Sequence, residues 1–300
     1  MPLLGTFGAG SSRGFGQKGG APKFVAASGG TVSTVGDFKV HTFTSPGTFC
    51  VSEAGNGVGS ETVEYLVVAG GGGGGQYQHS GGWAGAGGAG GFRQSNGTTA
   101  GCYPVADDCL AAPVTGMVGL SGPYSVVVGG GGGNNSSGSN STGGTISASG
   151  GGNGHGYPGI PGSPGGGGGQ GGNGNKGGYS PPEGFPGATG AGNGSQPQSN
   201  RGNGYSKDGQ TTLIQGAFPN TNVGEPYNNT RWFAAGGGSN PPTGNSQGGY
   251  GGGGDGQSPG TAGDANTGGG GGAGGQAGAP GAQAGGSGGS GVVILRYKFQ

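Results

Sequence analysis

Apolar and polar residues alternate along several short stretches of the chain, and these stretches predict β-strands. Residues 31–53 alternate on either side of a Ser-Pro-Gly turn at 45–47, which predicts a hairpin. Residues 62–69 become apolar on both sides toward their end, which is typical of a strand covered on both faces. A further strand is predicted over 116–128 and a weak, short one over 145–149.

The last ten residues, 291–300, predict one more strand. Val293, Leu295, Tyr297 and Phe299 form its apolar face, and its other face becomes charged at Arg296. Because it is the last strand of the sequence, this strand is expected to lie at the edge of a sheet with one side unpaired. No helix is expected anywhere, because Gly and Pro interrupt every window of helical length.

Two of the predicted strands run directly into glycine runs, at 70–75 and at 129–133. Glycine makes up 94 of the 300 residues, and only 28% of the chain is apolar, so a conventional core can serve only part of it. Composition alone favours disorder, but the interleaved strands favour order. Polyproline-II-type helices, with about three residues per turn, are the expected solution, because glycine lets their backbones approach and hydrogen-bond.

The predicted fold class is therefore mainly β. Short antiparallel strands frame a glycine-rich body of polyproline-II or polyglycine-II type, without significant helix. Residues 1–30 are Gly/Ser-rich and are interpreted as an N-terminal extended arm. Residues 31–300 form the glycine-rich β domain, which the strand at 291–300 closes.

Charge excludes several kinds of partner. Eleven basic and eleven acidic residues cancel, and no basic patch is present, so we expect no nucleic acid binding. No apolar stretch approaches the roughly 20 residues needed to span a bilayer, so we expect no membrane insertion. The first residues lack the pattern of a standard secretory signal, so we expect no export by that route.

No catalytic or cofactor-binding constellation is visible, and the chain is predicted not to be an enzyme. The histidines, His41, His79 and His155, are scattered and lack the partners of a catalytic triad. The acidic residues do not match the spacing of a calcium loop, so no metal site is expected. With this much glycine, matches to phosphate-binding loops arise by chance, and no cofactor is expected.

Cysteine use leaves an alternative open. Cys102 and Cys109 bracket a short loop and would, as a disulfide, contribute about 2–3 kcal/mol in the chain-entropy model. Two unpaired thiols are nearly as well supported, because the redox compartment is not known. Cys50, in an alternating stretch, is interpreted as a small buried residue.

Aromatic residues in two loops are the candidate receptor contacts. The first loop carries Tyr77 and Trp83, and the second carries Tyr227, Arg231, Trp232 and Phe233. Exposed aromatic rings beside amide groups suit neutral sugar surfaces. The competing interpretation, which has slightly more support, is that these rings pack beneath loops or fill the ends of the glycine body.

The order of motifs along the chain resembles a known family. The stretch Asp37 to Phe49, then Val63 to Ala69 followed by glycines, and the ending Gly291-Val292-Val293-Ile294-Leu295-Arg296-Tyr297 are similar to the glycine-rich domain of bacteriophage tail-fibre and other virion structural proteins. The resemblance covers about residues 31 to 300, and it supplies no catalytic residues.

This resemblance implies a virion surface protein, either a fibre or a fibre tip that recognises the host. Its implied partners are other virion proteins, through the N-terminal arm, and a glycan or outer-membrane protein of the host surface. A homo-oligomer, either a trimer or a polymer, fits such a role, although no heptad repeat is present. The insertion at 102–108 and the Pro/Asn-rich segment at 181–246 depart from the family pattern.

Two further interpretations lie within reach of the same sequence. Within the same class, the chain would be a capsid decoration or fibre-shaft protein. From another class, it would be a self-assembling extracellular filament, which suits an unblocked terminal strand, or an ice-binding protein. Ice binding requires a flat array of small residues at fixed spacing, and the irregular Asn, Gln and Pro insertions argue against it.

Overall fold

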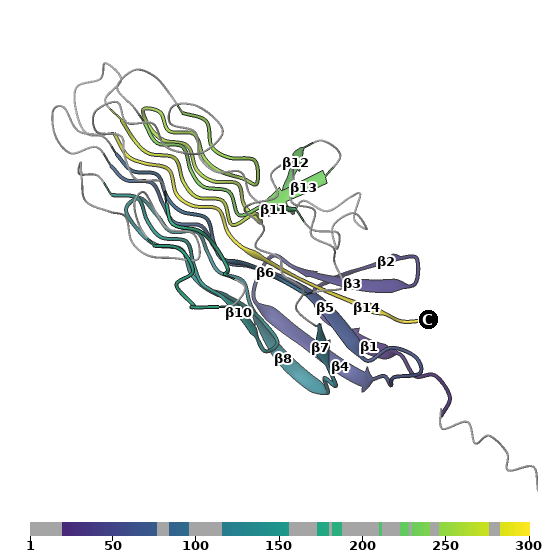
Figure 1. Ribbon diagram of the computed structural model, residues 1–300. Helices are drawn as coiled ribbons and strands as arrows, with labels where there is room; N and C mark the ends of the chain where they lie inside the picture. The colour runs from purple at the N-terminus through teal and green to yellow at the C-terminus, as the bar shows by residue number, and fades with distance from the viewer. Residues whose placement is uncertain are drawn as a thin grey trace, which may run out of the picture.

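The computed structural model describes residues 20–76, 84–95, 116–155, 173–179, 182–187, 210–211, 223–227, 230–240, 246–275 and 283–300. These residues form fourteen β-strands and contain no helix, as the frequent Gly and Pro residues predict (Figure 1). It follows that no membrane-spanning helix occurs in the described ranges. All strand pairs are antiparallel, which confirms the mainly β fold class.

The strands form two large sheets and one small one. The five-stranded sheet has the order β1 (Val25–Ser28), β4 (Gly47–Ala54), β8 (Gly122–Val127), β9 (Ser141–Gly143) and β10 (Ile146–Ala148). The six-stranded sheet has the order β2 (Thr31–Val35), β3 (Phe38–Phe43), β14 (Val292–Lys298), β5 (Thr62–Val68) and β6 (Phe92–Gln94), with β7 (Met117–Val118) also paired to β5. The small sheet has the order β11 (Gln210–Thr211), β13 (Thr230–Phe233) and β12 (Glu225–Tyr227).

The two large sheets pack face to face as a sandwich. Alternate residues of each strand point inward, and they form one buried cluster that draws on both sheets. From the six-stranded sheet come Tyr65, Val67 and Leu295, and from the five-stranded sheet come Phe49 and Val126. The apolar face predicted for 291–300 is therefore confirmed as core.

The outer face of the six-stranded sheet is also buried. Leu66, Val68 and Ile294 pack there against Val223 and Phe233, which belong to the region of the small sheet. β5 consequently has apolar neighbours on both faces, as its sequence predicts. Such double burial is possible because Val and Leu occupy successive positions at the end of this strand.

The hairpin predicted over 31–53 is wrong. β3 pairs with β2 and β14, whereas β4 pairs with β1 and β8, so the turn at 44–46 carries the chain from one sheet to the other. The hairpin in this region is β2–β3, which turns at Gly36 with a φ of 54°. A sheet-crossing turn and a hairpin turn have the same local sequence signature, and only the partner strands distinguish them.

The unblocked edge expected for the terminal strand is also wrong. β14 lies in the middle of its sheet, with β3 on one side and β5 on the other. The end of the chain is thus inserted between two strands that were formed from its first seventy residues. Burial of Val292 to Leu295 on both faces explains why this strand is central rather than at an edge.

Two other predicted boundaries differ from the structure. Residues 25–28, at the end of the predicted arm, form β1, and residues 1–19 of that arm lie outside the described residues. The strand predicted over 116–128 is two strands, β7 and β8, separated by Gly119 with a φ of 66°. The short strand predicted over 145–149 is confirmed as β10.

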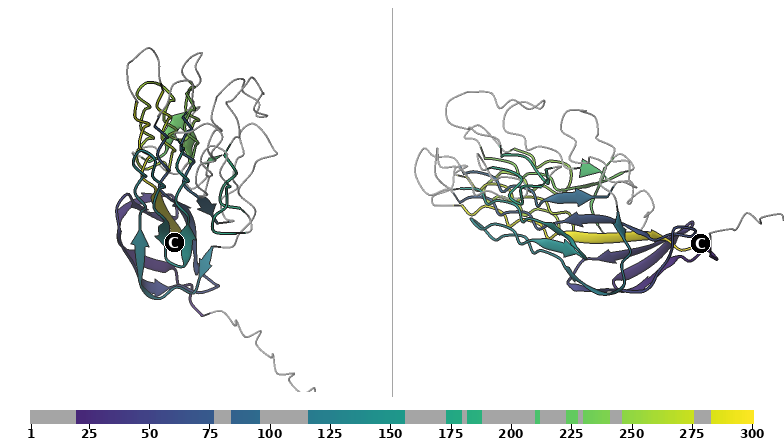
Figure 2. Two further views of the ribbon diagram at one scale, coloured as in Figure 1. Left: turned by 90° about the vertical axis from the view of Figure 1, so that its left-hand side faces the viewer. Right: turned by 60° about the horizontal axis from the view of Figure 1, so that its bottom comes forward.

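The glycine-rich segments continue the strands into a bundle beyond the sandwich (Figures 1 and 2). β5 leads into 70–76, β8 into 129–140, and β10 into 150–155, while 84–91 leads into β6 and 283–291 into β14. Segments 234–240 and 246–275 complete the described part of this glycine bundle. Figure 1 shows its members as wavy traces that run side by side.

The segment 70–75 lies at the centre of the bundle, and its backbone N–H groups follow a period of three. They donate in turn to segments 136–139, 286–289 and 85–88 and then repeat, over distances of 2.7–3.0 Å. Each of these three neighbours runs antiparallel to 70–75, since the acceptor number falls by three as the donor number rises by three. A period of three is the signature of a helix with about three residues per turn.

The carbonyl groups of 70–75 show the same period. They accept in turn from segments 151–154, 132–135 and 271–274, over 2.8–3.0 Å, and all three of these neighbours run parallel to it. Three acceptor and three donor neighbours therefore surround one helix. This arrangement satisfies every backbone polar group of the segment and confirms the predicted glycine-rich body of polyglycine-II type.

Candidate functional site

The described residues contain one group of partly exposed aromatic side chains, next to the β12–β13 hairpin. The rings of Tyr227 and Tyr250 stack with their centroids 3.8 Å apart and an interplanar angle of 15°. Trp232 meets the Tyr227 ring edge-on, at 6.4 Å and 68°. Both tyrosines are half-buried, whereas Trp232 is 3% exposed and lies underneath. We call Tyr227, Tyr250 and Trp232 the aromatic group.

A carboxylate holds the aromatic group in place. Oε2 of Glu225, two residues before Tyr227, accepts hydrogen bonds from the backbone N–H groups of Gly251 (2.6 Å) and Gly252 (2.8 Å). These two glycines have φ values of 118° and 88°, a conformation that other residues rarely adopt. The turn after Tyr250 is thus fixed to the start of β12, and the two tyrosine rings are brought together although they lie far apart in sequence.

Arg231 precedes Trp232 on β13 and pairs with Pro226 of β12. Its Nη1 atom donates a hydrogen bond to the carbonyl of Gly224 at 3.2 Å, and its side chain is half-buried. The arginine is therefore directed along the hairpin, where its charge stays partly accessible to solvent. The register of the hairpin places Arg231 on the face opposite to Tyr227 and Trp232, so its cation is separate from the stacked tyrosines.

Two predicted contact residues are buried rather than exposed. Trp232 is 3% exposed, and Phe233 is fully buried in the cluster that covers the outer face of the six-stranded sheet. The expectation that both are exposed is wrong. Successive residues of β13 point to opposite sides, so that Trp232 packs against Tyr227 and Phe233 packs against the six-stranded sheet. Trp232 and Phe233 therefore have a packing role.

The other predicted site residues lie outside the described residues. These are Tyr77, Trp83, Cys102 and Cys109. The glycine segments on either side of Tyr77 and Trp83 end together, since Gly75 N–H donates to the carbonyl of Gly85 at 2.7 Å. Receptor contact by these aromatic residues, and a disulfide between these cysteines, stay predictions. Cys50 is half-buried and has a free thiol.

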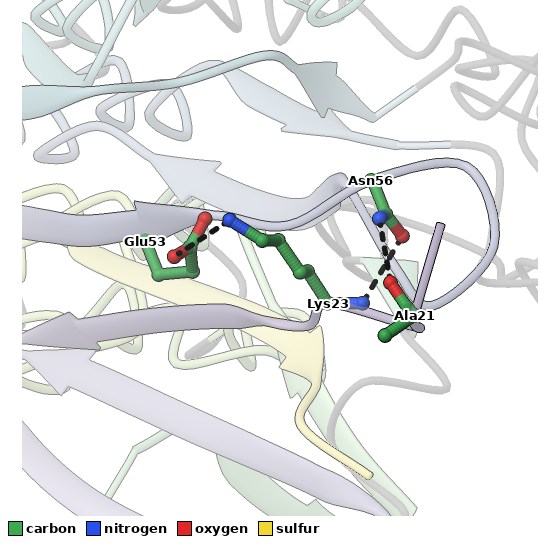
Figure 3. A network of polar contacts seen from close by, with 4 residues as sticks. All are labelled: Ala21, Lys23, Glu53 and Asn56. Atoms are coloured by element: carbon green, nitrogen blue, oxygen red, sulfur yellow. Dashed lines mark hydrogen bonds and ion pairs between the residues drawn. The ribbon is translucent and has the colours of Figure 1, made fainter. Parts of the chain in front are cut away.

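A second polar site clamps the beginning of the described chain (Figure 3). Asn56 Nδ2 donates to the carbonyl of Ala21 at 3.0 Å, and its Oδ1 accepts from the backbone N–H of Lys23 at 3.1 Å. The backbone N–H groups of Asn56 and Ser60 both donate to the carbonyl of Lys23 at 3.1 Å. We call these contacts the Asn56 clamp. It fixes the segment that connects residues 1–19 to β1.

An exposed ion pair adds little to the Asn56 clamp. Lys23 Nζ lies 3.8 Å from Glu53 Oε2, and both side chains are roughly half exposed, so solvent and salt screen their attraction (Figure 3). A partner that pulls on the N-terminal segment would therefore be resisted mainly by the amide of Asn56 and the backbone hydrogen bonds around it.

Both ring nitrogens of the buried His41 are hydrogen-bonded within the chain. Nδ1 of His41 lies 2.7 Å from the carbonyl of Gly29 and therefore donates to it, while Nε2 lies 3.2 Å from the hydroxyl of Tyr297. Burial lowers the pKa of His41 below its ordinary value, and the hydrogen bond to Gly29 opposes this only in part. Burial likewise raises the pKa of the Tyr297 hydroxyl. These contacts join the six-stranded sheet to the turn after β1.

Glu183 is a buried carboxylate with a similar structural role. It is 1% exposed, and its Oε2 and Oε1 accept from the backbone N–H groups of Ser149 and Gly177, each at 2.8 Å. Its own carbonyl accepts from Phe92 N–H at 2.8 Å. Oε2 therefore attaches the segment 182–187 to the end of β10, and Oε1 attaches it to the segment 173–179. Among the described residues, no three His, Cys, Asp or Glu side chains are arranged to hold a metal ion.

Sequence reasoning missed Tyr250 and Asn56. Tyr250 sits between glycines, and nothing local indicates that its ring would stack on Tyr227. Asn56 had a usable signal, because asparagine between glycines is typical of a turn whose side chain accepts backbone N–H groups. Its Oδ1 does so within its own loop, from Gly59 at 2.9 Å, and the link to Ala21 and Lys23 is the part that the sequence could not indicate.

Comparison with known proteins gives one result for the whole domain. A family model described as a glycine-rich domain matches residues 44–298, which include the sandwich strands from β4 onward, the glycine bundle and the aromatic group, but not β1, β2 and β3. No curated protein sequence matches the chain.

Proposed function

The chain belongs to the glycine-rich domain family, and from this premise we propose that it is a non-enzymatic structural protein of a bacteriophage virion, a fibre or fibre-tip protein that recognises a host surface. The observation that carries this proposal is the separation of two ends. The Asn56 clamp holds the N-terminal segment at the sandwich, and the glycine bundle extends away from it (Figure 1). A tip protein requires both an attached end and a projecting end.

The bundle suits a projecting element. Its segments are held by backbone hydrogen bonds in several directions, so the projection does not depend on a large apolar core. Only 7% of the chain is charged, and its formal net charge is zero. Recognition by shape and neutral hydrogen bonds would persist in high salt, where the Debye length falls to about 3 Å at 1 M and attraction between exposed charges is screened.

The aromatic group is the described surface that best fits a receptor. Stacked tyrosine rings offer a flat apolar area with hydroxyl groups at its rim, and this chemistry suits the faces of neutral sugars. We propose that a glycan of the host surface, or a glycosylated outer-membrane protein, is bound by Tyr227 and Tyr250, whereas Arg231 lies on the other face of the hairpin. The remaining partners would be other virion proteins, bound through the N-terminal arm, and the location would be the surface of the virion.

Gold-labelled antibody against this chain, applied to particles from its native source and viewed by electron microscopy, tests the proposal. Label at the ends of fibres would support host recognition. Label along fibres or over the capsid would instead indicate a shaft or decoration protein. Absence of label from every particle would overturn the assignment to a virion and favour a free extracellular filament.

One observation supports a second candidate, an ice-binding protein. Neighbouring outer segments of the glycine bundle expose small residues at three-residue intervals: Gly130 and Gly133, Ala284 and Ser287, Ala262 and Ala265. The segments are adjacent, since Gly288 N–H donates to the carbonyl of Gly132, and Gly263 N–H to that of Ser287, each at 2.8 Å. Thermal hysteresis of the purified chain would support this candidate, and normal ice growth would exclude it.

A further inference from the structure

The two sheets of the sandwich have five outer strands; β7 is only two residues long, and three of the other four are blocked. β1 has an irregular register between Ala26 and Ala27, which interrupts its edge. On β10, the carbonyl of Ser147 accepts a hydrogen bond from Nη1 of Arg93 at 2.9 Å. On β6, the N–H of Phe92 donates to the carbonyl of Glu183 at 2.8 Å, so the segment 182–187 covers this strand. Such features prevent an edge from pairing with another chain.

β2 is the remaining outer strand, and it carries none of these features. Its five residues, Thr31–Val35, pair with β3 in an uninterrupted register and include no charge, proline or glycine. Among the described residues, no backbone group of β2 hydrogen-bonds to any segment except β3. Val32 is 48% exposed, so an apolar side chain lies on this open edge. A regular, uncharged edge of β-branched residues is a template for another strand.

Ser33, in the middle of β2, supplies an independent observation. Its hydroxyl oxygen is buried, yet it has no hydrogen-bond partner within the described part of the chain. Buried polar atoms are normally paired, because an unpaired hydroxyl costs free energy. If the Ser33 side chain rotates toward the open edge of β2, a hydroxyl on a partner strand opposite it would satisfy this atom.

We propose that β2 pairs antiparallel with β2 of a second copy of this chain, about a two-fold axis at Ser33. In this register Thr31 faces Val35, Val32 faces Thr34, and the two Ser33 hydroxyls face each other. Every flanking pair is then β-branched, and directly opposite hydroxyls hydrogen-bond readily across strands. No like charges oppose each other, since β2 is uncharged. The two six-stranded sheets become one continuous sheet, and the interface is isologous, as in most soluble dimers.

The first test measures the mass of the full chain by sedimentation velocity, from micromolar to hundreds of micromolar concentration. We expect a reversible dimer. Val32→Lys should weaken it by roughly tenfold or more, because it places a charge on the shared edge. Val118→Lys, at a strand valine that is 51% exposed but lies on β7, should leave it intact. A wild-type chain that stays monomeric, or a Val32→Lys variant that dimerises as well as wild type, overturns the proposal.

The second test examines the register. Ser33→Cys should give a disulfide-linked dimer on mild oxidation, beyond any formed by the wild-type chain with its own cysteines, because opposite residues lie within disulfide reach. Thr31→Cys should not, since the two copies of that residue would be about 13 Å apart along the strands. Equal crosslinking of both variants would overturn the two-fold register at Ser33. Circular dichroism of each variant establishes that it is folded.

Discussion

Glu64 and Arg296 form an ion pair across β5 and β14, although 232 residues separate them in sequence. Their side chains are 16% and 12% exposed, and the guanidinium of Arg296 also lies over the ring of Phe38, 4.6 Å from its centroid. The pair therefore connects β5 to β14, the last strand of the chain. It lies where the outer face of β14 changes from apolar to charged. Because the two charges are paired, no partly buried charge is left without a partner at this point of the sheet.

Removing one member of this pair should destabilise the domain. Glu64→Ala or Arg296→Ala leaves a partly buried charge without its partner, and we expect a loss on the order of 2 kcal/mol in the free energy of unfolding. The double variant Glu64→Leu with Arg296→Met should recover most of the loss, because neither charge remains. Urea unfolding of the three variants measures this. Additive losses in a double-alanine variant would show that the two side chains do not interact.

A methyl group at the centre of the glycine bundle should be far more harmful than one at its surface. A Cβ on Gly73 would lie 1.9 Å from the carbonyl oxygen of Gly133, so Gly73→Ala forces two backbones apart. We expect a loss of about 3 kcal/mol or more. Gly133→Ala is the matched control, since a Cβ there meets nothing within 4 Å. Thermal unfolding compares them, and equal midpoints would contradict the close packing of the bundle.

His41 should make the domain less stable in mild acid. Its pKa is lowered in the folded state by burial, whereas the unfolded chain has the ordinary value of about 6.5. Below that pH the unfolded state binds a proton that the folded state does not, so stability falls as pH decreases from about 6.5 toward the lowered pKa. His41→Gln should show a smaller decrease between pH 7.5 and 5.5 in urea unfolding. Parallel curves for the two proteins would exclude His41 as the cause.

The Asn56 clamp should protect the start of the described chain from proteolysis. Asn56→Ala removes the amide bonds to Ala21 and Lys23, and we expect faster trypsin cleavage after Lys23 without loss of the overall fold. Glu53→Gln is the control, because it removes only the exposed ion pair with Lys23 and should change the cleavage rate little. Equal rates in wild type and Asn56→Ala would show that the clamp does not hold this segment.

The aromatic group gives variants that separate binding from folding. Tyr250→Ala removes one half-exposed ring of the stacked pair and should weaken attachment to host cells while the chain stays folded. Trp232→Ala removes a buried ring and should cost about 3 kcal/mol or more of stability. Cell-binding assays at matched folded concentration, with unfolding curves for each variant, distinguish the effects. Full attachment by Tyr250→Ala would exclude the stacked pair as the receptor site.

Local sequence patterns were enough to predict several of the strands and the glycine segments that continue them. β5, β10 and β14 were predictable because alternation and apolar runs are local patterns that depend on backbone geometry alone. The glycine body was predictable because so little apolar surface leaves backbone hydrogen bonding as its main support. Tyr227 and Arg231 were predicted to be receptor contacts from their residue types in one loop, and the structure establishes only their position.

The order of the strands within each sheet could be read only from the three-dimensional structure. β3 and β4 follow each other in sequence yet belong to different sheets, and β14 is central although it is last. Strand partners are selected by burial on both faces of the whole sheet, which no local pattern encodes. In the glycine bundle, neighbouring segments are even harder to predict from sequence, because glycines have no side chain to distinguish one neighbour from another. There a flanking strand fixes the place of those segments that have one, whereas Tyr250 meets Tyr227 because the Glu225 carboxylate binds the turn at Gly251 and Gly252.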